Sequence, residues 1–331
     1  MLPREMKVPK NIKLTGPTAK FIKENYYHYS SQTLKNATMA CKDIINSGGK
    51  LFISIAGASS TARLGISIAK LIRAGYVCGI STTGANLEED VFNLIAQNSY
   101  LQIPDYKDLT PEDDAALAKK RINRVTDAAI PATSMKEVED VIIDEWKNSK
   151  ERKFPHEYLT SILLSGNLKS HYQINPDESW LLAAAEHNIT IVTPGWEDST
   201  LGNVFASLVR KMEVDYNIMK MGIEAMNYLA DWYLKDKSKK IFFQLGGGIA
   251  GDFPICVVPF LRQDCQMGDK VKHWDGFVQL TNAIVDEGGY SGAAPTEKIT
   301  WDKISKKTPK FSIHGDFTIN APLIFNALLG E

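Results

Sequence analysis

Short apolar runs alternate with amphipathic segments of helical length along much of the chain. Residues 51–56 (LFISIA) and 77–82 are apolar runs of strand length, and each is followed by a turn of small or polar residues. The segments after those turns, 61–73 and 87–96, carry apolar side chains at helical spacing. The order strand, helix, strand, helix predicts a parallel sheet covered by helices.

The same alternation returns in the second half of the chain. Further strands are predicted at 189–192, 240–245, 277–281 and 311–313, and helices at 203–212, 216–234 and 321–329. The predicted fold class is therefore α/β, with a doubly wound and mostly parallel sheet. The charged, helix-rich stretch 105–154 is interpreted as an insertion or lobe within one domain that spans 1–331. The glycine-rich stretch 286–295 is predicted to be irregular, and long ordered loops in enzymes are often functional.

Composition and charge narrow the possible functions. The net charge is −1 and there is no long basic run, so a nucleic-acid backbone is not expected as the main partner. Residues 1–10 are polar, and no stretch approaches the roughly 20 apolar residues that span a bilayer. The four cysteines form no CxxC pair and no spacing typical of a metal site. Together these features predict a cytoplasmic protein with no membrane segment and no bound metal.

Small or hydroxylated residues follow several of the predicted strands. They occur at 57–61, 83–86, 194–202 and 246–248. In a doubly wound sheet these strand ends share one edge, where ligands bind, and helix N-termini there favour phosphate groups. A nucleotide cofactor is one interpretation. Ordinary turns between strands and helices are the other, because neither a GxGxxG nor a P-loop motif is present.

Acidic and aromatic residues accompany the same junctions and the glycine-rich stretch. If the carboxylates converge, they would attract a cation, and a polyamine could place its methylenes on the faces of Trp196, Tyr290 and Trp301. The alternative is a solvated acidic surface. The acidic residues are Glu88, Glu89, Asp90, Glu197, Asp198, Asp252, Asp286, Glu287, Glu297 and Asp316.

Lys303 is a candidate nucleophile. A lysine forms an imine with a carbonyl-like carbon if it is desolvated enough to be partly neutral, and Lys303 lies two residues after Trp301. A solvated surface lysine is the alternative. The histidines show no metal-ligand spacing, and Ser59-Ser60 lacks the G-x-S-x-G context of a serine hydrolase.

Four ordered motifs resemble those of the deoxyhypusine synthase family. SGAAPTEKITWDKI (291–304) resembles the family segment that leads through a tryptophan to the reactive lysine. TTGANLEED (82–90), PGWEDSTLGN (194–203) and LGGGI (245–249) resemble its cofactor-binding segments, in the same order. The resemblance extends from residue 51 to the C-terminus, and AGASSTARLGIS and FPHEYL are most similar to the bacterial deoxyhypusine synthase-like branch.

This resemblance implies a Rossmann-like NAD-binding fold and a homotetramer with active sites at a dimer interface. The family transfers a 4-aminobutyl group from spermidine to an acceptor amine through an imine on the lysine. NAD takes up a hydride at the start and returns it at the end, so it is a recycled cofactor.

The resemblance also assigns roles by position. Lys303 corresponds to the imine-forming nucleophile, and Glu297 and Trp301 to residues that line the polyamine site. Glu89 and Asp198 would suit ribose hydroxyls. The positions that match NAD contacts are Ser59, Ser60, Thr83, Gly84, Glu89, Asp198, Gly247, Asn282, Ala283 and Asp316.

Four departures from the family pattern fall in the donor site. Asp252 stands where the family has a histidine and Cys256 where it has an asparagine, while Tyr290 and Asn203 replace aspartates. We include Asp252, Tyr290 and Asn203 among the substrate-binding candidates. We favour a small diamine such as putrescine as acceptor, which would give homospermidine. The alternatives are a protein lysine, as in deoxyhypusine synthesis, another amine such as agmatine, and a non-catalytic regulator that binds NAD or a polyamine.

Overall fold

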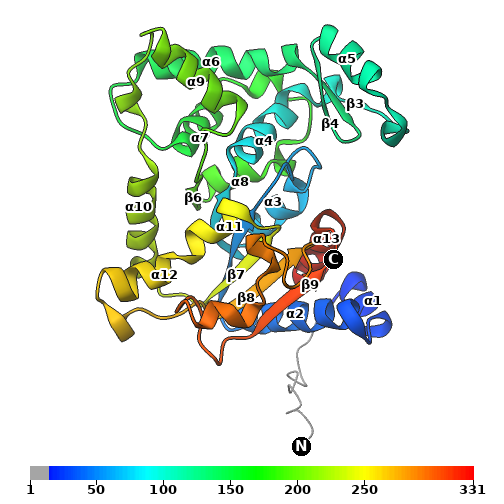
Figure 1. The fold of residues 1–331 in the computed structure, drawn as a ribbon, viewed down its shortest axis with the longest axis vertical. Coiled ribbons are helices and arrows are strands. Elements are labelled where there is room, and N and C mark those ends of the chain that lie inside the picture. The colour runs from blue at the N-terminus through cyan, green and yellow to red at the C-terminus, as the bar shows by residue number, and fades with distance from the viewer. Residues whose placement is uncertain (1–14) are drawn as a thin grey trace, which may run out of the picture.

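A parallel six-stranded sheet forms the centre of the protein (Figure 1). The computed structural model describes residues 15–331. The strands are β1 (Lys50–Ile55), β2 (Val77–Thr82), β6 (Thr190–Val192), β7 (Lys240–Leu245), β8 (Gly276–Thr281) and β9 (Lys310–His314).

The strand order is β6-β2-β1-β7-β8-β9, with every neighbouring pair parallel. The chain therefore builds outward from β1 to one edge and then returns to add β7, β8 and β9 on the other side. This order confirms the predicted doubly wound α/β fold and places the topological switch point between β1 and β7, where ligands bind in such sheets.

The inner strands are apolar because both of their faces are covered. Every residue of β2, β7 and β8 is buried, as is typical of parallel strands between two helical layers. On one face, Phe52, Phe242 and Phe277 stack along the sheet with ring centroids 5.7 and 6.1 Å apart, and Trp274 packs on Phe242 at 5.0 Å. This aromatic layer fixes the position of the strands relative to the helices above them.

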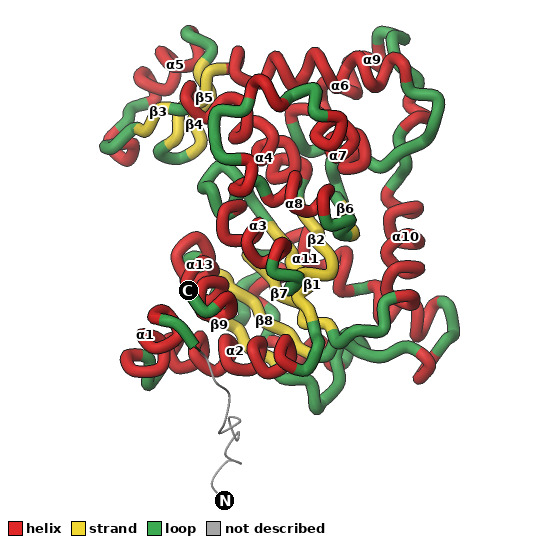
Figure 2. The backbone as a smooth tube through the Cα atoms, turned by 180° about the vertical axis from the view of Figure 1, so that it is seen from behind, coloured by secondary structure: helices red, strands yellow, loops and turns green. Residues whose placement is uncertain are grey.

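Helices cover the sheet on both sides. One face packs against α2 (Tyr29–Asn46), α3 (Gly65–Arg73) and α13 (Phe317–Leu329), which lie in front of the strands in Figure 2. The other face packs against α10 (Gly222–Lys235), α11 (Gly248–Ile255) and α12 (Val257–Pro259). The remaining helices are α1 (Pro17–Asn25), α4 (Gly84–Ala96), α5 (Pro111–Lys119), α6 (Lys136–Asn148), α7 (Pro155–Ser165), α8 (Trp180–Glu186) and α9 (Thr200–Arg210).

The stretch 105–154 contains helices α5 and α6 and also part of a second sheet. Its three antiparallel strands, in the order β3-β5-β4, are β3 (Leu101–Gln102), β4 (Ile122–Val125) and β5 (Ala128–Pro131). These strands were not predicted, because segments of two to four residues are too short to display an alternating pattern.

Helix boundaries differ from the predictions where a turn or cap takes the first residues. The predicted helix 61–73 begins only at Gly65, since Arg63 has a left-handed backbone (φ 59°). The predicted helix 216–234 begins at Gly222, after a short 3₁₀ turn. Helix α11, which directly follows the glycine turn, was not predicted, because glycines and Pro254 both disfavour helix. Within residues 15–331, no helix is long and apolar enough to cross a bilayer.

Candidate active site

The side chain of Lys303 meets that of Asp252 on the face of the sheet that α11 covers. Lys303 is 8% exposed, and its Nζ donates a hydrogen bond to Asp252 Oδ1 at 2.7 Å. Asp252 lies on α11, which starts directly after the glycine turn that ends β7. The structure thus brings together two candidates 51 positions apart in the chain. Asp252 is half exposed, so the ion pair is open to solvent on the Asp252 side.

Tyr290 and Cys256 complete the surroundings of this ion pair. Lys303 Nζ lies 5.6 Å from the centre of the Tyr290 ring, and Cys256 Sγ lies 3.6 Å from Asp252 Oδ1. The Tyr290 hydroxyl is buried and has no hydrogen-bond partner in the described part of the chain. Burial raises the pKa of the Tyr290 phenol and of the Cys256 thiol, so both stay protonated at neutral pH.

Asp302 holds the turn that presents Lys303. Its backbone is left-handed (φ 56°), a conformation that Asp tolerates better than most residues. Its carboxylate accepts hydrogen bonds from Arg262 Nε at 2.7 Å and His273 Nε2 at 2.6 Å. These partners were not predicted, since a sequence shows no sign of contacts between residues 29 and 40 positions apart.

Lys298 is a second lysine in the same cluster and was also not predicted. It is 3% exposed, and its Nζ lies over the rings of Phe277 and Tyr290, 4.7 and 4.9 Å from their centres. Its carbonyl accepts the backbone N–H of Lys303 at 3.0 Å. Burial, and then the nearby Lys303 ammonium, lower the pKa of Lys298 to about 8. The sequence signal that could have pointed to Lys298 was its place in the lysine motif. Its burial, however, depends on the fold and could not be predicted from that motif.

Other donor-site candidates lie further out. Trp301 is 66% exposed, and Glu297 is exposed and accepts the backbone N–H of Ala294 at 3.2 Å. Asn203, on α9, is exposed and donates to the carbonyl of Ser199 at 2.7 Å. None of these side chains makes a hydrogen bond or ion pair with Lys303 among the described contacts.

The hydroxyls after β1 and β2 that were predicted to bind NAD make hydrogen bonds to the protein's own backbone. Ser59 Oγ donates to the carbonyl of Ala56 at 2.8 Å, and Ser60 Oγ donates to the carbonyl of Asn86 at 2.8 Å. Thr83 caps α4 by accepting the N–H of Asn86 at 3.2 Å. These residues shape the turns at the switch point.

The glycines among the candidates allow the turns to pack closely. A Cβ atom on Gly84 would lie 2.7 Å from the carbonyl oxygen of Trp196, so the turns after β2 and β6 touch there. A Cβ atom on Gly247 would lie 1.8 Å from Ser291 Oγ, so the glycine turn after β7 touches the loop before Lys303. Substitution at either position would separate the segments that form the site.

The three carboxylates of the predicted acidic turn have different tasks. Glu88 accepts the N–H groups of Thr200 and Leu201 at 2.9 and 2.7 Å and so caps α9. Asp90 caps α8 through the N–H of Leu181 and the hydroxyl of Ser179. Burial raises the pKa of Glu88 to about 7 and that of Asp90 to about 6. Both carboxylates serve the fold.

The third carboxylate and four further candidates lie in or beside the turns that follow the strands. Glu89 is buried and accepts the Tyr100 hydroxyl at 3.0 Å. Asp198 and Asn282 are exposed in the turns after β6 and β8. Asp316 caps α13 through the N–H of Thr318 at 2.8 Å. The remaining candidate is Ala283, whose N–H is held by Thr281 Oγ1 at 3.0 Å.

Buried polar atoms at this edge fit a polar ligand such as a dinucleotide. Thr82 Oγ1, Thr193 Oγ1 and Gln244 Oε1 have no hydrogen-bond partner among residues 15–331. Thr82 is the last residue of β2, Gln244 lies one residue before the end of β7, and Thr193 directly follows β6. Buried polar groups are normally paired, so oxygens of this kind mark places where a ligand can bind.

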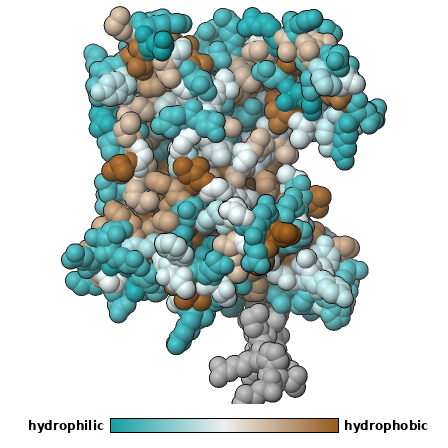
Figure 3. Space-filling model, viewed as in Figure 1, coloured by the Kyte–Doolittle hydropathy of each residue, from teal (hydrophilic) through white to brown (hydrophobic). Residues whose placement is uncertain are grey.

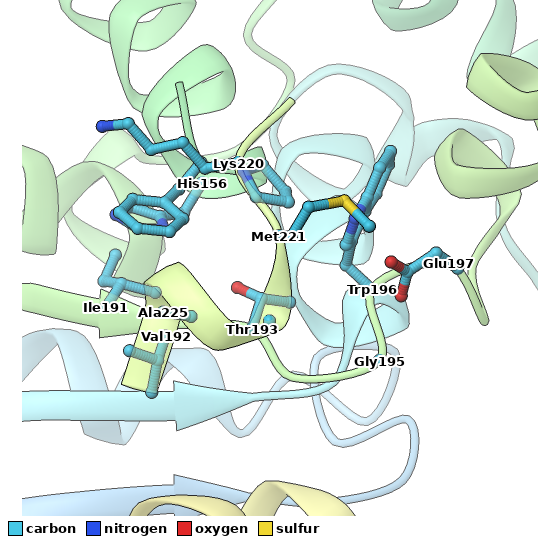
Figure 4. A pocket seen from close by; sticks show the side chains of 13 residues that line it. His156, Ile191, Val192, Thr193, Gly195, Trp196, Glu197, Lys220, Met221 and Ala225 are labelled. Atoms are coloured by element: carbon cyan, nitrogen blue, oxygen red, sulfur yellow. The ribbon is translucent and has the colours of Figure 1, made fainter. Parts of the chain in front are cut away.

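A separate pocket of about 50 Å³ lies at the end of β6, between α7 and α10 (Figure 4). Trp196, Met221 and Glu197 line it beside His156, whose pKa burial lowers to about 3. Trp196 packs on Phe205, with ring centroids 5.6 Å apart. Among the aromatic residues considered for a polyamine, Tyr290 therefore lies beside Lys303, whereas Trp196 belongs to this other pocket.

Within the described chain, no three His, Cys, Asp or Glu side chains gather as they would around a metal ion.

Comparison with known proteins identifies the family. The family model described as deoxyhypusine synthase matches residues 23–328. A deoxyhypusine synthase-like protein of Nostoc sp. is 30% identical over 325 residues, covering 93% of this chain and 80% of the relative. A protein of Sulfurisphaera tokodaii described as a deoxyhypusine synthase is 26% identical over 314 residues, covering 93% of this chain and 91% of the relative.

The fold agrees with this assignment. A crystal structure from Entamoeba histolytica, described as that of a deoxyhypusine synthase, superposes with a TM-score of 0.56 at 12% identity, covering 94% of this chain and 92% of that one. At this identity the likeness concerns the fold alone. Because the family model spans nearly the whole chain, the protein belongs to the deoxyhypusine synthase family, whose members are NAD-dependent enzymes that transfer an aminobutyl group.

Proposed function

We propose that this protein transfers a 4-aminobutyl group from a polyamine such as spermidine to a small diamine, through an imine on Lys303. The observation that carries the proposal is the buried Lys303 amine, held 2.7 Å from Asp252 of α11 on the aromatic face of a doubly wound sheet. A desolvated lysine is suited to imine chemistry.

The chain's own residues account for the covalent steps. The free amine of Lys303 forms a C–N bond to the iminium carbon of the donor, and the bond from that carbon to 1,3-diaminopropane breaks. Asp252 then lies beside the positively charged iminium on Lys303 and stabilises it as a counterion. An acceptor amine attacks the same carbon and releases Lys303.

Bound NAD would supply the acceptor for the hydride that leaves the polyamine carbon at the start of the reaction. It would supply the source of the hydride that returns at the end. The residues that would hold it are those at the strand ends: the turns of Thr83 and Gly247, and the exposed side chains of Asp198, Asn282 and Asp316. The buried oxygens at the same edge support a polar ligand there.

The donor site supports a small acceptor. Tyr290 and Asn203 stand where the family pattern has aspartates, so the site offers fewer carboxylates to a long polycation. The remaining anion beside the nucleophile is Asp252, which suits the ammonium of a short diamine. Transfer from spermidine to putrescine gives homospermidine and 1,3-diaminopropane, with all atoms accounted for. A protein lysine is the second candidate acceptor, because archaeal relatives are described as deoxyhypusine synthases.

The test is incubation of the purified protein with NAD and spermidine, with putrescine, agmatine or a lysine-bearing initiation factor as acceptor, followed by mass spectrometry. We expect 1,3-diaminopropane and homospermidine in the putrescine reaction. Modification of the protein substrate alone would favour deoxyhypusine synthesis. Binding of NAD without product from any amine would identify a non-catalytic regulator.

A further inference from the structure

A pocket of about 80 Å³ lies at the amino edge of the sheet, opposite the turns that follow the strands. Two segments form most of its wall: residues 236–240, which lead into β7, and residues 270–275, which lead into β8. A single water needs roughly 10–15 Å³ of such space, so the pocket can hold a group of several heavy atoms.

Cationic side chains dominate the lining of this pocket. With His273 neutral, four lysines face two carboxylates, which leaves a formal charge of +2 in a chain whose net charge is −1. The lysines are Lys237, Lys240, Lys270 and Lys272, and the carboxylates are Asp236 and Asp275. The pocket therefore favours an anion.

Both carboxylates already serve the protein's own backbone. Asp275 Oδ2 accepts the N–H of Lys240 at 2.9 Å, and Asp236 Oδ1 accepts the N–H of Ser238 at 2.8 Å. The Lys240 side chain, only 4% exposed, donates from Nζ to the carbonyls of Asp236 and Ser238 at 2.5 and 3.1 Å. These bonds fix the segment before β7 as one rigid wall.

Three polar groups of the pocket are left over. Lys270 and Lys272 are exposed, and their ammonium groups have no ion-pair partner among residues 15–331. The buried hydroxyl of Ser238, on the opposite wall, also lacks a partner in this part of the chain. Lysines bind phosphate as point charges, and a hydroxyl can donate to a phosphate oxygen. A phosphate monoester is close to a dianion at neutral pH and so matches the charge of the pocket, which a single carboxylate would only half neutralise.

The second wall of the pocket is attached to the segment that carries Lys303. His273 lines the pocket, and its Nε2 lies 2.6 Å from Asp302 Oδ1. The next residue, Trp274, pairs with Ile304 in a parallel bridge. Lys303 lies between these two attachment points, so the wall and the turn of Lys303 form one contiguous network.

We propose that this pocket binds a phosphate group, free or on a small ester, and that the bound anion reduces local opening of the Lys303 turn. The anion would bridge Lys270 and Lys272 to Ser238 and so tie the two walls together. This inference goes beyond the proposed function, because neither the binding nor the ordering of the turn requires Lys303 to be the nucleophile.

Isothermal titration calorimetry with inorganic phosphate and with glycerol phosphate, at constant ionic strength, tests the site. The variant Lys270→Gln with Lys272→Gln removes two exposed charges, and Lys119→Gln with Lys120→Gln, at the exposed end of α5, is the matched control. We expect binding about five- to tenfold weaker in the first variant than in the wild type and the control, as for the loss of two exposed ion pairs. Equal affinity in the three proteins, or no binding to any of them, would overturn the site.

The two ligands distinguish the sources of the phosphate group. Tighter binding of glycerol phosphate would support a phosphorylated metabolite, and tighter binding of inorganic phosphate would support the free anion.

Hydrogen exchange measured by peptide mass spectrometry tests the link to the Lys303 turn. The backbone N–H of Lys303 donates to the carbonyl of Lys298 at 3.0 Å, so it exchanges only when the turn opens. We expect saturating phosphate to slow exchange in residues 298–304 of the wild type and the control, and to a smaller extent at the same concentration in the Lys270 and Lys272 variant. Binding with unchanged exchange in residues 298–304 would overturn the link. Neither measurement uses the transfer reaction, so its outcome is separate from that of the proposed function.

Discussion

Lys303 and Asp252 are the residues on which the proposed chemistry depends, and the sequence identified them unequally. Lys303 could be predicted as a site residue because its motif resembles the family's lysine segment. Asp252 could be predicted because it stands where the family pattern has a different residue. Their contact, and the burial of Lys298 beside them, could not be predicted. Both depend on how α11 and the loop before β9 pack on the aromatic layer of the sheet, which no local pattern encodes.

Replacement of Lys303 should separate chemistry from cofactor binding. We expect Lys303→Ala to lower the transfer rate by at least about 10³-fold, because the covalent intermediate is lost. NAD affinity should stay within about twofold of the wild type, as the predicted cofactor positions lie in other turns. Steady-state assays and NAD fluorescence titration measure the two quantities. Comparable transfer by Lys303→Ala would exclude a lysine imine at this position.

At the scale of elements, strands were predicted more accurately than helices. β2 and β7 have the predicted bounds, because a buried parallel strand is a continuous apolar run. Helix α11 was missed, since its glycines and Pro254 disfavour helix and only packing against β1 and β7 stabilises it. The short strands β3, β4 and β5 form through pairing with each other and carry no pattern of their own.

The turn that presents Lys303 should depend on the Asp302 carboxylate. Asp302→Ala leaves Arg262 and His273 without their shared partner, and we expect a loss of about 1–3 kcal/mol in unfolding free energy together with lower transfer activity. Asp269→Asn is the matched control, because Asp269 pairs with the same Arg262 at a fully exposed position. Equal effects of the two substitutions in urea unfolding would show that Asp302 does not hold the turn.

Burial of the Glu88 carboxyl, which caps α9, should make the stability of the protein depend on pH. Its pKa is raised to about 7 in the folded state, so its protonated form is favoured there, and its contribution is complete below pH 4.5 and lost as the pH rises to about 7. The unfolding free energy of the wild type relative to Glu88→Gln should therefore fall by about 2–3 kcal/mol across that range. Urea unfolding from pH 4.5 to 7.5 measures it, with exposed Glu112→Gln as the control. A constant difference would contradict the account.

At the scale of the whole molecule, the doubly wound order brings the turns after all the strands of the main sheet to one edge. Proposed cofactor positions lie in turns on both sides of the switch, and Asp252 and the lysine segment follow β7 and β8. That edge also exposes apolar side chains: Ile249 is 54%, Ile284 65% and Val285 64% exposed. Figure 3 shows apolar residues gathered across the middle of the face that carries α11. We propose that residues 105–154 form a lobe of the single domain and that the edge is an interface.

Assembly should therefore respond to charge at this edge. We expect the wild type to be a homotetramer by light scattering, and Ile284→Glu with Val285→Glu to weaken it, because burying carboxylates in an apolar interface is unfavourable. Ile223→Glu, also at an exposed position but at the start of α10, is the control. A monomeric wild type, or the same mass for all three proteins, would place the subunit interface elsewhere or remove it.

The central claim is that Lys303 carries the aminobutyl group during transfer, and trapping that intermediate tests it most directly. The protein is incubated with NAD and spermidine, reduced with borohydride, digested and mapped by mass spectrometry, with Lys303→Arg treated in parallel. We expect a 4-aminobutyl adduct on Lys303 that depends on both NAD and spermidine and is absent from Lys303→Arg. An adduct on Lys298, or product formation with no adduct on any lysine, would contradict it.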